Sequence, residues 1–185
     1  MGNKVSPTEQ ICMNAMHELI QDKVIGKISV QDVLDKAGIS KATFYRHYAD
    51  KYDLYEKMIT RDVGYIFSDS CELYQWQDRI HTWLRTTQVD KTTYVRMQRS
   101  DPNGFLSFYS NLIYGLFTKR LRRIDKSMSS PDAQLHARIL FMSAGVAALY
   151  CDWIQDNCQA NYSIFAATVI EFITAIARGT KLAAS

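Results

Sequence analysis

Apolar side chains recur every three or four residues along most of the chain, the period of a helix that buries one face. The first such segment opens at Ser6, which can cap a helix, followed by Pro7 at the first helical position and Glu9, which can bond back to the cap. Its apolar positions are Ile11, Ala15, Met16, Leu19 and Ile20. We predict an amphipathic helix that begins here and fades over residues 22–26.

Two shorter helices follow closely. Ser29 and Asp32 open the second helix, and Gly38 ends it; the third runs from Ser40 to about Tyr48, with a fourth starting at about residue 50. Short helices joined by a tight glycine-containing turn form a helix-turn-helix. Spacing alone fits a purely structural helical hairpin equally well.

The third helix carries the chemistry that separates these alternatives. On a helical period Ile39, Phe44 and Tyr48 can face a core, which leaves Lys41, Thr43, Tyr45, Arg46 and His47 for the other faces. Residues 41–51 carry a formal charge of +2, whereas residues 1–50 balance six basic against six acidic side chains. Positive charge is thus concentrated where a DNA-reading helix needs it. Simpler interpretations are a solvated Lys51, a Tyr45 that covers the first helix, and an Arg46 paired with Asp50.

Composition narrows the class of protein. The chain has 185 residues, 47% hydrophobic and 22% charged, which suits one globular domain or two small ones sharing a core. Only 3 prolines and 8 glycines favour an all-α fold over a turn-rich β-sandwich. The net charge of +3 is too small to indicate DNA binding by itself.

Cysteine spacing and hydropathy argue against several other classes. The four cysteines form no C-x-x-C pair and have no histidine at metal-ligand spacing, so we expect reduced core thiols and no metal. Cys151 and Cys158 are too far apart for a disulfide while both are helical. No secretory signal is evident, and the uncharged stretch between Arg138 and Asp152 is shorter than the roughly 20 residues of a spanning helix. We expect a soluble cytoplasmic protein.

One motif resembles a known family. The run Val30-x-x-Val33-Leu34-x-x-Ala37-Gly38-Ile39-Ser40-Lys41-x-Thr43-Phe44-Tyr45-x-x-Tyr48-x-x-Lys51-x-x-Leu54 resembles the DNA-binding domain of tetracycline-repressor-like (TetR family) transcription regulators. It covers about the first third of the chain. The remainder resembles the family in length, helical pattern and aromatic richness. Tyr48 departs from the family, which most often has Phe there.

The resemblance implies an all-helical homodimer with a helix-turn-helix DNA-binding domain over residues 1–50 and a helical effector-binding and dimerisation domain over residues 51–185. Early third-helix residues would approach base edges, while Tyr45, His47, Lys51 and Ser29 would contact phosphates. The expected DNA-binding set is Ser29, Ser40, Lys41, Ala42, Thr43, Tyr45, Arg46, His47 and Lys51.

The implied function is an effector-responsive repressor that binds a palindromic double-stranded DNA operator. A family member acting through a partner protein as a coactivator is the alternative. An enzyme is disfavoured, since the four histidines are scattered and no carboxylate pair or glycine-rich phosphate loop is evident.

The C-terminal part is rich in aromatic residues, with half of the chain's aromatic side chains between residues 65 and 130. Such crowding is commonly core, but the resemblance implies a pocket for an unidentified small-molecule effector, without a cofactor. Candidate lining residues are Trp83, Tyr94, Phe108, Tyr109 and Tyr114.

Three further segments complete the prediction. The basic run Lys119–Lys126 ends a helix that begins near Phe105; it is either a solvated end or an anion-binding patch. A nearly all-apolar helix follows Asp132, and a last helix spans about Tyr162–Arg178. Two such helices per subunit can form a four-helix dimer interface. Its expected residues are Phe141, Ala144, Gly145, Ala148, Phe165, Val169, Phe172 and Ile173.

Overall fold

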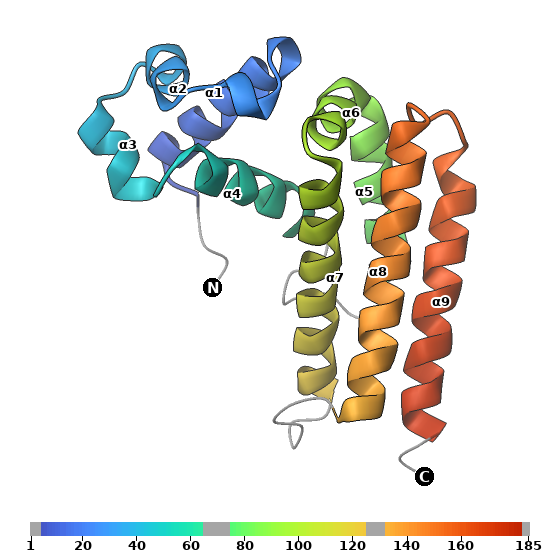
Figure 1. Cartoon of the computed structure of the whole chain (residues 1–185). Coiled ribbons are helices and arrows are strands. Elements are labelled where there is room, and N and C mark those ends of the chain that lie inside the picture. The colour runs from blue at the N-terminus through green and yellow to red at the C-terminus, as the bar shows by residue number, and fades with distance from the viewer. Residues whose placement is uncertain (1–4, 65–74, 125–131, 183–185) are drawn as a thin grey trace.

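Helices form every regular element in residues 5–64, 75–124 and 132–182, the parts that the structure, a computed structural model, describes (Figure 1). The all-α prediction is confirmed. In chain order the elements are α1 (Pro7–Asp22), the 3₁₀ turn η1 (Ile25–Lys27), α2 (Val30–Ala37), α3 (Lys41–His47), α4 (Lys51–Gly64), α5 (Gln75–Val89), α6 (Lys91–Ser100), α7 (Pro102–Ile124), α8 (Ala133–Gln155) and α9 (Tyr162–Leu182).

The first helices begin and end where local chemistry dictates. Ser6 and Glu9 form a reciprocal capping box at α1, and Ser29 and Asp32 do the same at α2. Gly38 ends α2 in the left-handed conformation (φ 65°, ψ 35°), which turns the chain toward α3. The prediction for Ile11 is wrong, because its side chain is 46% exposed and the inward face of α1 is rotated toward Cys12 and Met13.

The N-terminal helices share one core. α1 packs against α2 and α4, and the side chains of Phe44, Tyr48, Leu54 and Met58 are buried beneath them. The Tyr48 hydroxyl donates to the Glu9 backbone carbonyl at 3.4 Å, so the family's usual phenylalanine is replaced without leaving a polar group unpaired. Since α4 contributes to this core, residues 51–64 extend the N-terminal unit; a domain boundary at residue 50 stays a prediction.

The C-terminal helices form an elongated bundle. α7 and α8 lie side by side along their length, α9 packs against α8 and α5, and α6 crosses one end of the bundle (Figure 1). The long side chains of Trp83, Tyr109 and Tyr150 fill the interior between α5, α7 and α8. α3 lies at the end of the molecule away from α8 and α9.

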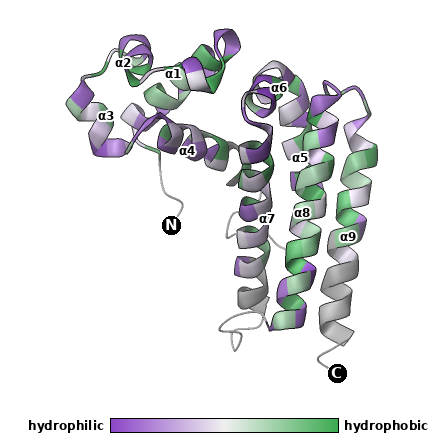
Figure 2. Cartoon of the chain, in the orientation of Figure 1, coloured by the Kyte–Doolittle hydropathy of each residue, from purple (hydrophilic) through white to green (hydrophobic). Residues whose placement is uncertain are grey.

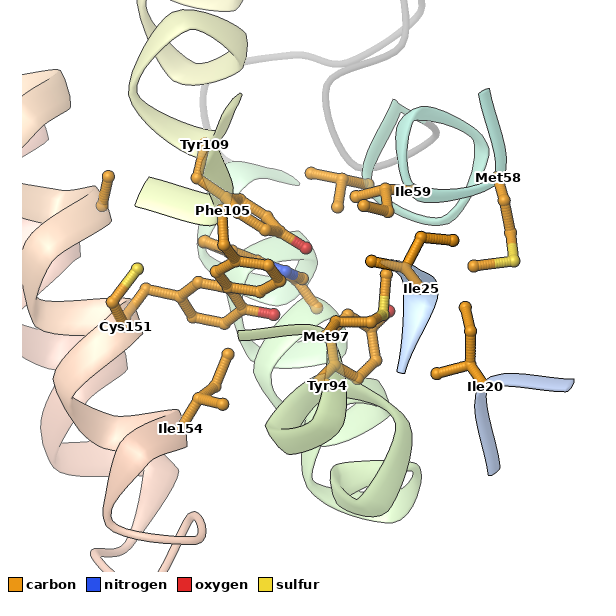
Figure 3. Close-up of a cluster of buried hydrophobic side chains, with 14 of the residues drawn as sticks. Ile20, Ile25, Met58, Ile59, Tyr94, Met97, Phe105, Tyr109, Cys151 and Ile154 are labelled. Atoms are coloured by element: carbon orange, nitrogen blue, oxygen red, sulfur yellow. The ribbon is translucent and has the colours of Figure 1, made fainter. Parts of the chain in front are cut away.

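α6 connects this bundle to the N-terminal helices. It packs against α1 and η1 as well as α7 and α8, so the buried side chains of Ile20 and Ile25 continue into those of Tyr94 and Met97 (Figure 3). At the edge of the contact, Nε2 of His17 lies 2.6 Å from Oδ2 of Asp90. The two parts of the molecule therefore meet through an apolar seam with a polar rim.

The described cysteines match the expectation of core thiols. Cys12, Cys151 and Cys158 are free and buried, and burial raises the pKa of Cys151 and Cys158 to about 11. Cys158 follows α8 with a positive φ of 54°, outside the helix. Cys71 lies outside the described residues.

α8 is apolar along most of its length (Figure 2). By length and composition alone, Ala133–Gln155 could cross a membrane, and half of the apolar window is buried inside the molecule. Burial of this kind is typical of a core helix, and one such helix is weak evidence for a membrane.

Candidate nucleic-acid interface

α3 is held by one buried face. The Phe44 side chain is fully buried, and its ring centroid lies 5.4 Å from that of Tyr48. At the start of the helix, the Ser40 hydroxyl accepts a hydrogen bond from the Thr43 backbone amide at 3.1 Å. The helix has only seven residues, so these two anchors determine which side faces away from the molecule.

The opposite side of α3 carries polar side chains that reach solvent. Lys41, Ala42 and Arg46 are exposed, and Tyr45 is 49% exposed. The Lys41 ammonium lies 6.0 Å from the centre of the Tyr45 ring, so a cation and a phenol share one patch. A short helix with a small residue and flanking cations can enter a major groove and contact phosphates.

Among the remaining candidates near α3, Thr43 and His47 are less exposed, whereas Ser40 is exposed. The hydroxyl of Thr43 lies 2.9 Å from that of Ser40, at the start of α3, and His47 is half-buried at the end of the helix. These residues lie along the same short helix as Lys41 and Tyr45, so the structure brings the candidates of α3 together. Their contacts with DNA stay predictions.

Ser29 lies at the N-terminus of α2. Its hydroxyl accepts from the Asp32 backbone amide at 3.0 Å and donates to the Asp32 carboxylate at 2.6 Å. Hydrogen bonds from Lys23 and from Ser29 lower the pKa of Asp32, so this carboxylate stays ionised near neutral pH. The hydroxyl is therefore committed to the capping box, and a phosphate contact by Ser29 has to compete with it.

Lys51 has a different environment from the one expected of a phosphate ligand. Its ammonium donates to the backbone carbonyls of Ile25 at 3.0 Å, Gly26 at 3.1 Å and Ile28 at 2.5 Å. No sequence pattern indicates this contact, because its partners lie more than twenty residues earlier. Direct phosphate contact by Lys51 stays a prediction, and the carbonyl contacts compete with it.

Among the effector-pocket candidates, Trp83, Tyr94 and Tyr109 are buried in the bundle. The rings of Trp83 and Tyr109 lie 4.4 Å and 4.7 Å from that of Tyr150, and Tyr150 shares a 2.8 Å hydrogen bond with Thr87. Burial raises the pKa of Tyr109 and of Tyr150, so both hydroxyls stay protonated. These residues form an uncharged aromatic cluster; a role in effector binding stays a prediction.

The other two pocket candidates, Phe108 and Tyr114, lie at the margin of the aromatic cluster or apart from it. Phe108 is half-buried and meets the Tyr109 ring edge-on at 5.4 Å. The Tyr114 hydroxyl lies 2.6 Å from Nδ1 of His136, in an exposed contact between α7 and α8.

Most of the basic run Lys119–Lys126 falls outside the residues whose side chains are described. Within the described side chains, no three His, Cys, Asp or Glu residues are grouped to hold a metal ion.

Apolar side chains are exposed on both α8 and α9, and together these residues are called the apolar strip. Phe141 is 81% exposed, Ala144, Gly145 and Ala148 of the same helix are exposed, and Phe172 of α9 is 52% exposed. Leu140 and Leu149 of α8 and Ile164 of α9 are also exposed, although the sequence pattern did not mark them as interface residues. Exposed apolar patches of this kind mark interaction surfaces.

Two α9 residues correct the predicted interface. Val169 is only 1% exposed within the single chain, so assigning it to the dimer surface is wrong; it packs in the chain's own core. Phe165 is half-buried and stacks on Trp153 with 6.0 Å between ring centroids. The side chain of Ile173 lies outside the described residues. Because α9 has only a narrow polar stripe, its sequence is compatible with several rotations about the helix axis. In the structure, α9 packs against α5 and α8 in the rotation that exposes Ile164.

Comparison with known proteins places this architecture in a family. Residues 13–58 match the model of "Bacterial regulatory proteins, tetR family", and residues 74–175 match a "Transcriptional regulator C-terminal region". The chain belongs to the TetR family of transcriptional regulators, and its N-terminal helices form the family's DNA-binding helix-turn-helix.

Individual relatives are distant. The HTH-type dhaKLM operon transcriptional activator DhaS of Lactococcus lactis subsp. lactis (strain IL1403) is 23% identical over 145 residues, covering 77% of this chain and 76% of DhaS. A solved structure of the dihydroxyacetone kinase operon activator DhaS has a TM-score of 0.61 at 20% identity, covering 95% of this chain and 97% of that one. A TetR regulator from Streptococcus agalactiae 2603V has a TM-score of 0.59 at 18% identity over 92% and 95% of the chains. These likenesses show the fold.

Proposed function

We propose that the protein is a cytoplasmic homodimer that reads an inverted-repeat operator and changes its DNA affinity when a small-molecule effector binds. The observation that carries the proposal is the outward face of α3, where Lys41, Tyr45 and Arg46 are exposed above the buried Phe44. In a twofold dimer, two such helices can enter successive major grooves about 34 Å apart. No catalytic role is assigned.

The dimer half of the proposal is supported by the strip on α8 and α9. Phe141 of α8 and Ile164 of α9 expose large apolar side chains to water, and the exposed small residues Ala144, Gly145 and Ala148 of α8 would let two helices approach closely. Pairing with a second copy removes this surface from water. Two copies then present two α3 helices related by a twofold axis.

The sign of regulation has two candidates. Occupation of an operator that overlaps a promoter represses transcription, which is the behaviour we first expect for an effector-released dimer. Activation is the second candidate because the relative DhaS is described as an operon activator. In either case the α3 surface is the DNA-reading element, and action through a partner protein is compatible with the activating case.

The test is selection of duplex fragments from a random pool by the purified protein, followed by sequencing. Wild type should enrich an inverted repeat, whereas Lys41→Ala/Tyr45→Ala should not. Lys91→Ala is the matched control, because it removes an exposed lysine of α6 outside the reading surface. Enrichment of the same repeat by the double variant would contradict the assignment of α3.

A further inference from the structure

We infer that α4 positions the DNA-reading motif, formed by α2 and α3, through two of its own lysines, Lys51 and Lys57. The ammonium groups of these lysines bind backbone carbonyls at the two ends of the motif. One end is the turn before α2, and the other is the last residue of α3. The inference deepens the proposed function, because it concerns how the α3 surface is held for DNA. Both lysines act as positioning residues.

The contacts of Lys51 are concentrated on one turn. Its ammonium binds the carbonyls of Ile25, Gly26 and Ile28, which lie in η1 and directly after it. Carbonyls at the end of a helical turn have few partners within the turn, so a cation there satisfies several of them at once. The next residue is Ser29, the N-cap of α2, so the contact fixes the start of the helix-turn-helix.

The place of Lys51 in its own helix supports this role. It is the first residue of α4, where the positive end of the helix dipole disfavours a cation. Local helix stability therefore gives no reason for a lysine at this position. The carbonyl oxygens of the neighbouring turn supply the negative potential that the helix end lacks.

Lys57 makes the corresponding contact at the other end of the motif. Its ammonium donates to the His47 carbonyl at 3.0 Å and to the Asp53 carboxylate at 3.1 Å, and it lies 5.1 Å from the centre of the Tyr48 ring. His47 is the last residue of α3, so its carbonyl has no partner within that helix. The same Asp53 oxygen accepts from the Ala49 amide at 2.9 Å, which ties down the connection between α3 and α4.

Through these two lysines, α4 contacts both ends of the DNA-reading motif. They are six residues apart, about 9 Å along the helix axis, and they bind segments on either side of the α2–α3 turn. Leu54 and Met58 of the same helix are buried in the core shared with α1. A displacement of α4 is therefore passed to both ends of the DNA-reading motif.

This role predicts a salt response different from that of a phosphate contact. Losing one phosphate contact per half-site lowers the slope of log affinity against log salt by about 0.9 for each half, or about 1.8 for a dimer. Losing a positioning contact weakens binding by a similar factor at every salt concentration, because no counterion release is lost.

The binding test compares Lys51→Met, Lys57→Met and the control Lys36→Met on the selected operator duplex across a range of salt. Lys36 is an exposed lysine of the same domain that pairs only with Glu18 among the described residues, so its variant removes the same charge without freeing a carbonyl. Lys51→Met and Lys57→Met should raise Kd about tenfold over Lys36→Met, with the same slope. A slope reduced by about 1.8, or a Kd within about twofold of the control, would overturn the inference.

A second measurement needs no DNA and keeps the test independent of the operator. Amide hydrogen exchange of the free protein should accelerate over residues 25–34 in Lys51→Met and over residues 44–50 in Lys57→Met, with α8 unchanged. Unchanged exchange in those segments would overturn the inference. If wild type selects no inverted repeat, the proposed function fails while this comparison still decides the positioning role.

Arginine variants guard against a general loss of folding. A guanidinium group also donates to carbonyl oxygens, so Lys51→Arg and Lys57→Arg should retain most of the operator affinity and the slow exchange. Arginine variants as weak as the methionine variants would contradict carbonyl binding.

Discussion

The backbone of Gly38 sets the angle between the two helices of the DNA-reading motif. Its φ of 65° lies in the left-handed region, which residues with a Cβ adopt at a cost. A Cβ built at this position meets no atom within 4 Å. A substitution here is therefore penalised by backbone conformation alone, without a steric clash.

We predict that Gly38→Ala lowers the free energy of unfolding by about 1 kcal/mol, or about 2–4 °C in Tm for a chain of this size. Thermal unfolding followed by circular dichroism measures the change. Gly26→Ala is the control, since Gly26 also has open space around a built Cβ but no positive φ. Equal losses in both variants would show that the strain is not located at Gly38.

Residues with short-range roles could be predicted from sequence, and residues with long-range roles could not. The caps Ser6, Ser29 and Ser40 each bond to a residue three positions ahead, so their role is evident in a short stretch of chain. Lys51 bonds to a turn that only the tertiary fold brings to it. The sequence identifies Lys51 as a cation near the motif but not what its ammonium binds.

Among the helices, α1 has an N-terminus whose stability depends on the charge of one side chain, Glu9. The Glu9 carboxylate accepts a 2.8 Å hydrogen bond from the Ser6 backbone amide, and Ser6 accepts one in return from the Glu9 amide. The bond to the Ser6 backbone, followed by that to its side chain, lowers the pKa of Glu9 below its ordinary 4.5. The ionised form thus stabilises the folded state.

We predict a pH dependence for this capping box. Because the folded pKa is depressed, the stabilisation is fully present above about pH 4.5 and is lost as pH falls through the lower folded value. Glu9→Gln, which keeps a capping side chain without the charge, should be less stable than wild type at pH 7, and the difference should shrink as pH falls below about 4.5. Urea unfolding over a series of pH values measures this, and a difference that does not shrink on acidification would contradict a charge effect.

The least predictable feature of the helices was which face of α8 and of α9 is buried. α8 and α9 are apolar on most sides, so their sequences indicate burial without saying against what. In the structure, neighbouring helices cover one face of each of these helices. Leu140, Phe141 and Ile164 stay exposed, whereas Val169 is buried. The starts of α1, α2, α3 and α8 were predicted correctly because they depend on local caps, whereas no limits were predicted for α5 and α6. Which face of a helix is buried depends on tertiary partners.

For the whole molecule, α6 is the physical connection between the aromatic cluster and the DNA-reading end. Its residues Tyr94 and Met97 are buried in the seam with α1 and η1, and the helix also packs against α7 and α8. Thr93 of α6 contacts both Gln21 of α1 and the Asp90 carboxylate. A shift of α6 would act on α1 and η1, and η1 supplies two of the three carbonyls bound by Lys51, those of Ile25 and Gly26.

We predict that Phe141→Glu converts the proposed dimer to monomers, because burying an unpaired carboxylate between two α8 helices would be costly. Sedimentation equilibrium at micromolar concentration should give a mass near one chain for the variant and two for wild type. Val89→Glu is the control, since Val89 is 82% exposed at the end of α5, a helix that contributes no residue to the predicted interface. A wild-type mass of one chain would contradict the dimer.

In the proposed dimer, two α3 helices read two half-sites together, so affinity should depend on the spacing between the half-sites. Binding should be measured to the selected inverted repeat and to the same repeat with about 5 base pairs, half a helical turn, inserted at its centre. The insertion should lower affinity to that of a duplex with a single half-site. Equal affinity for both duplexes would contradict it.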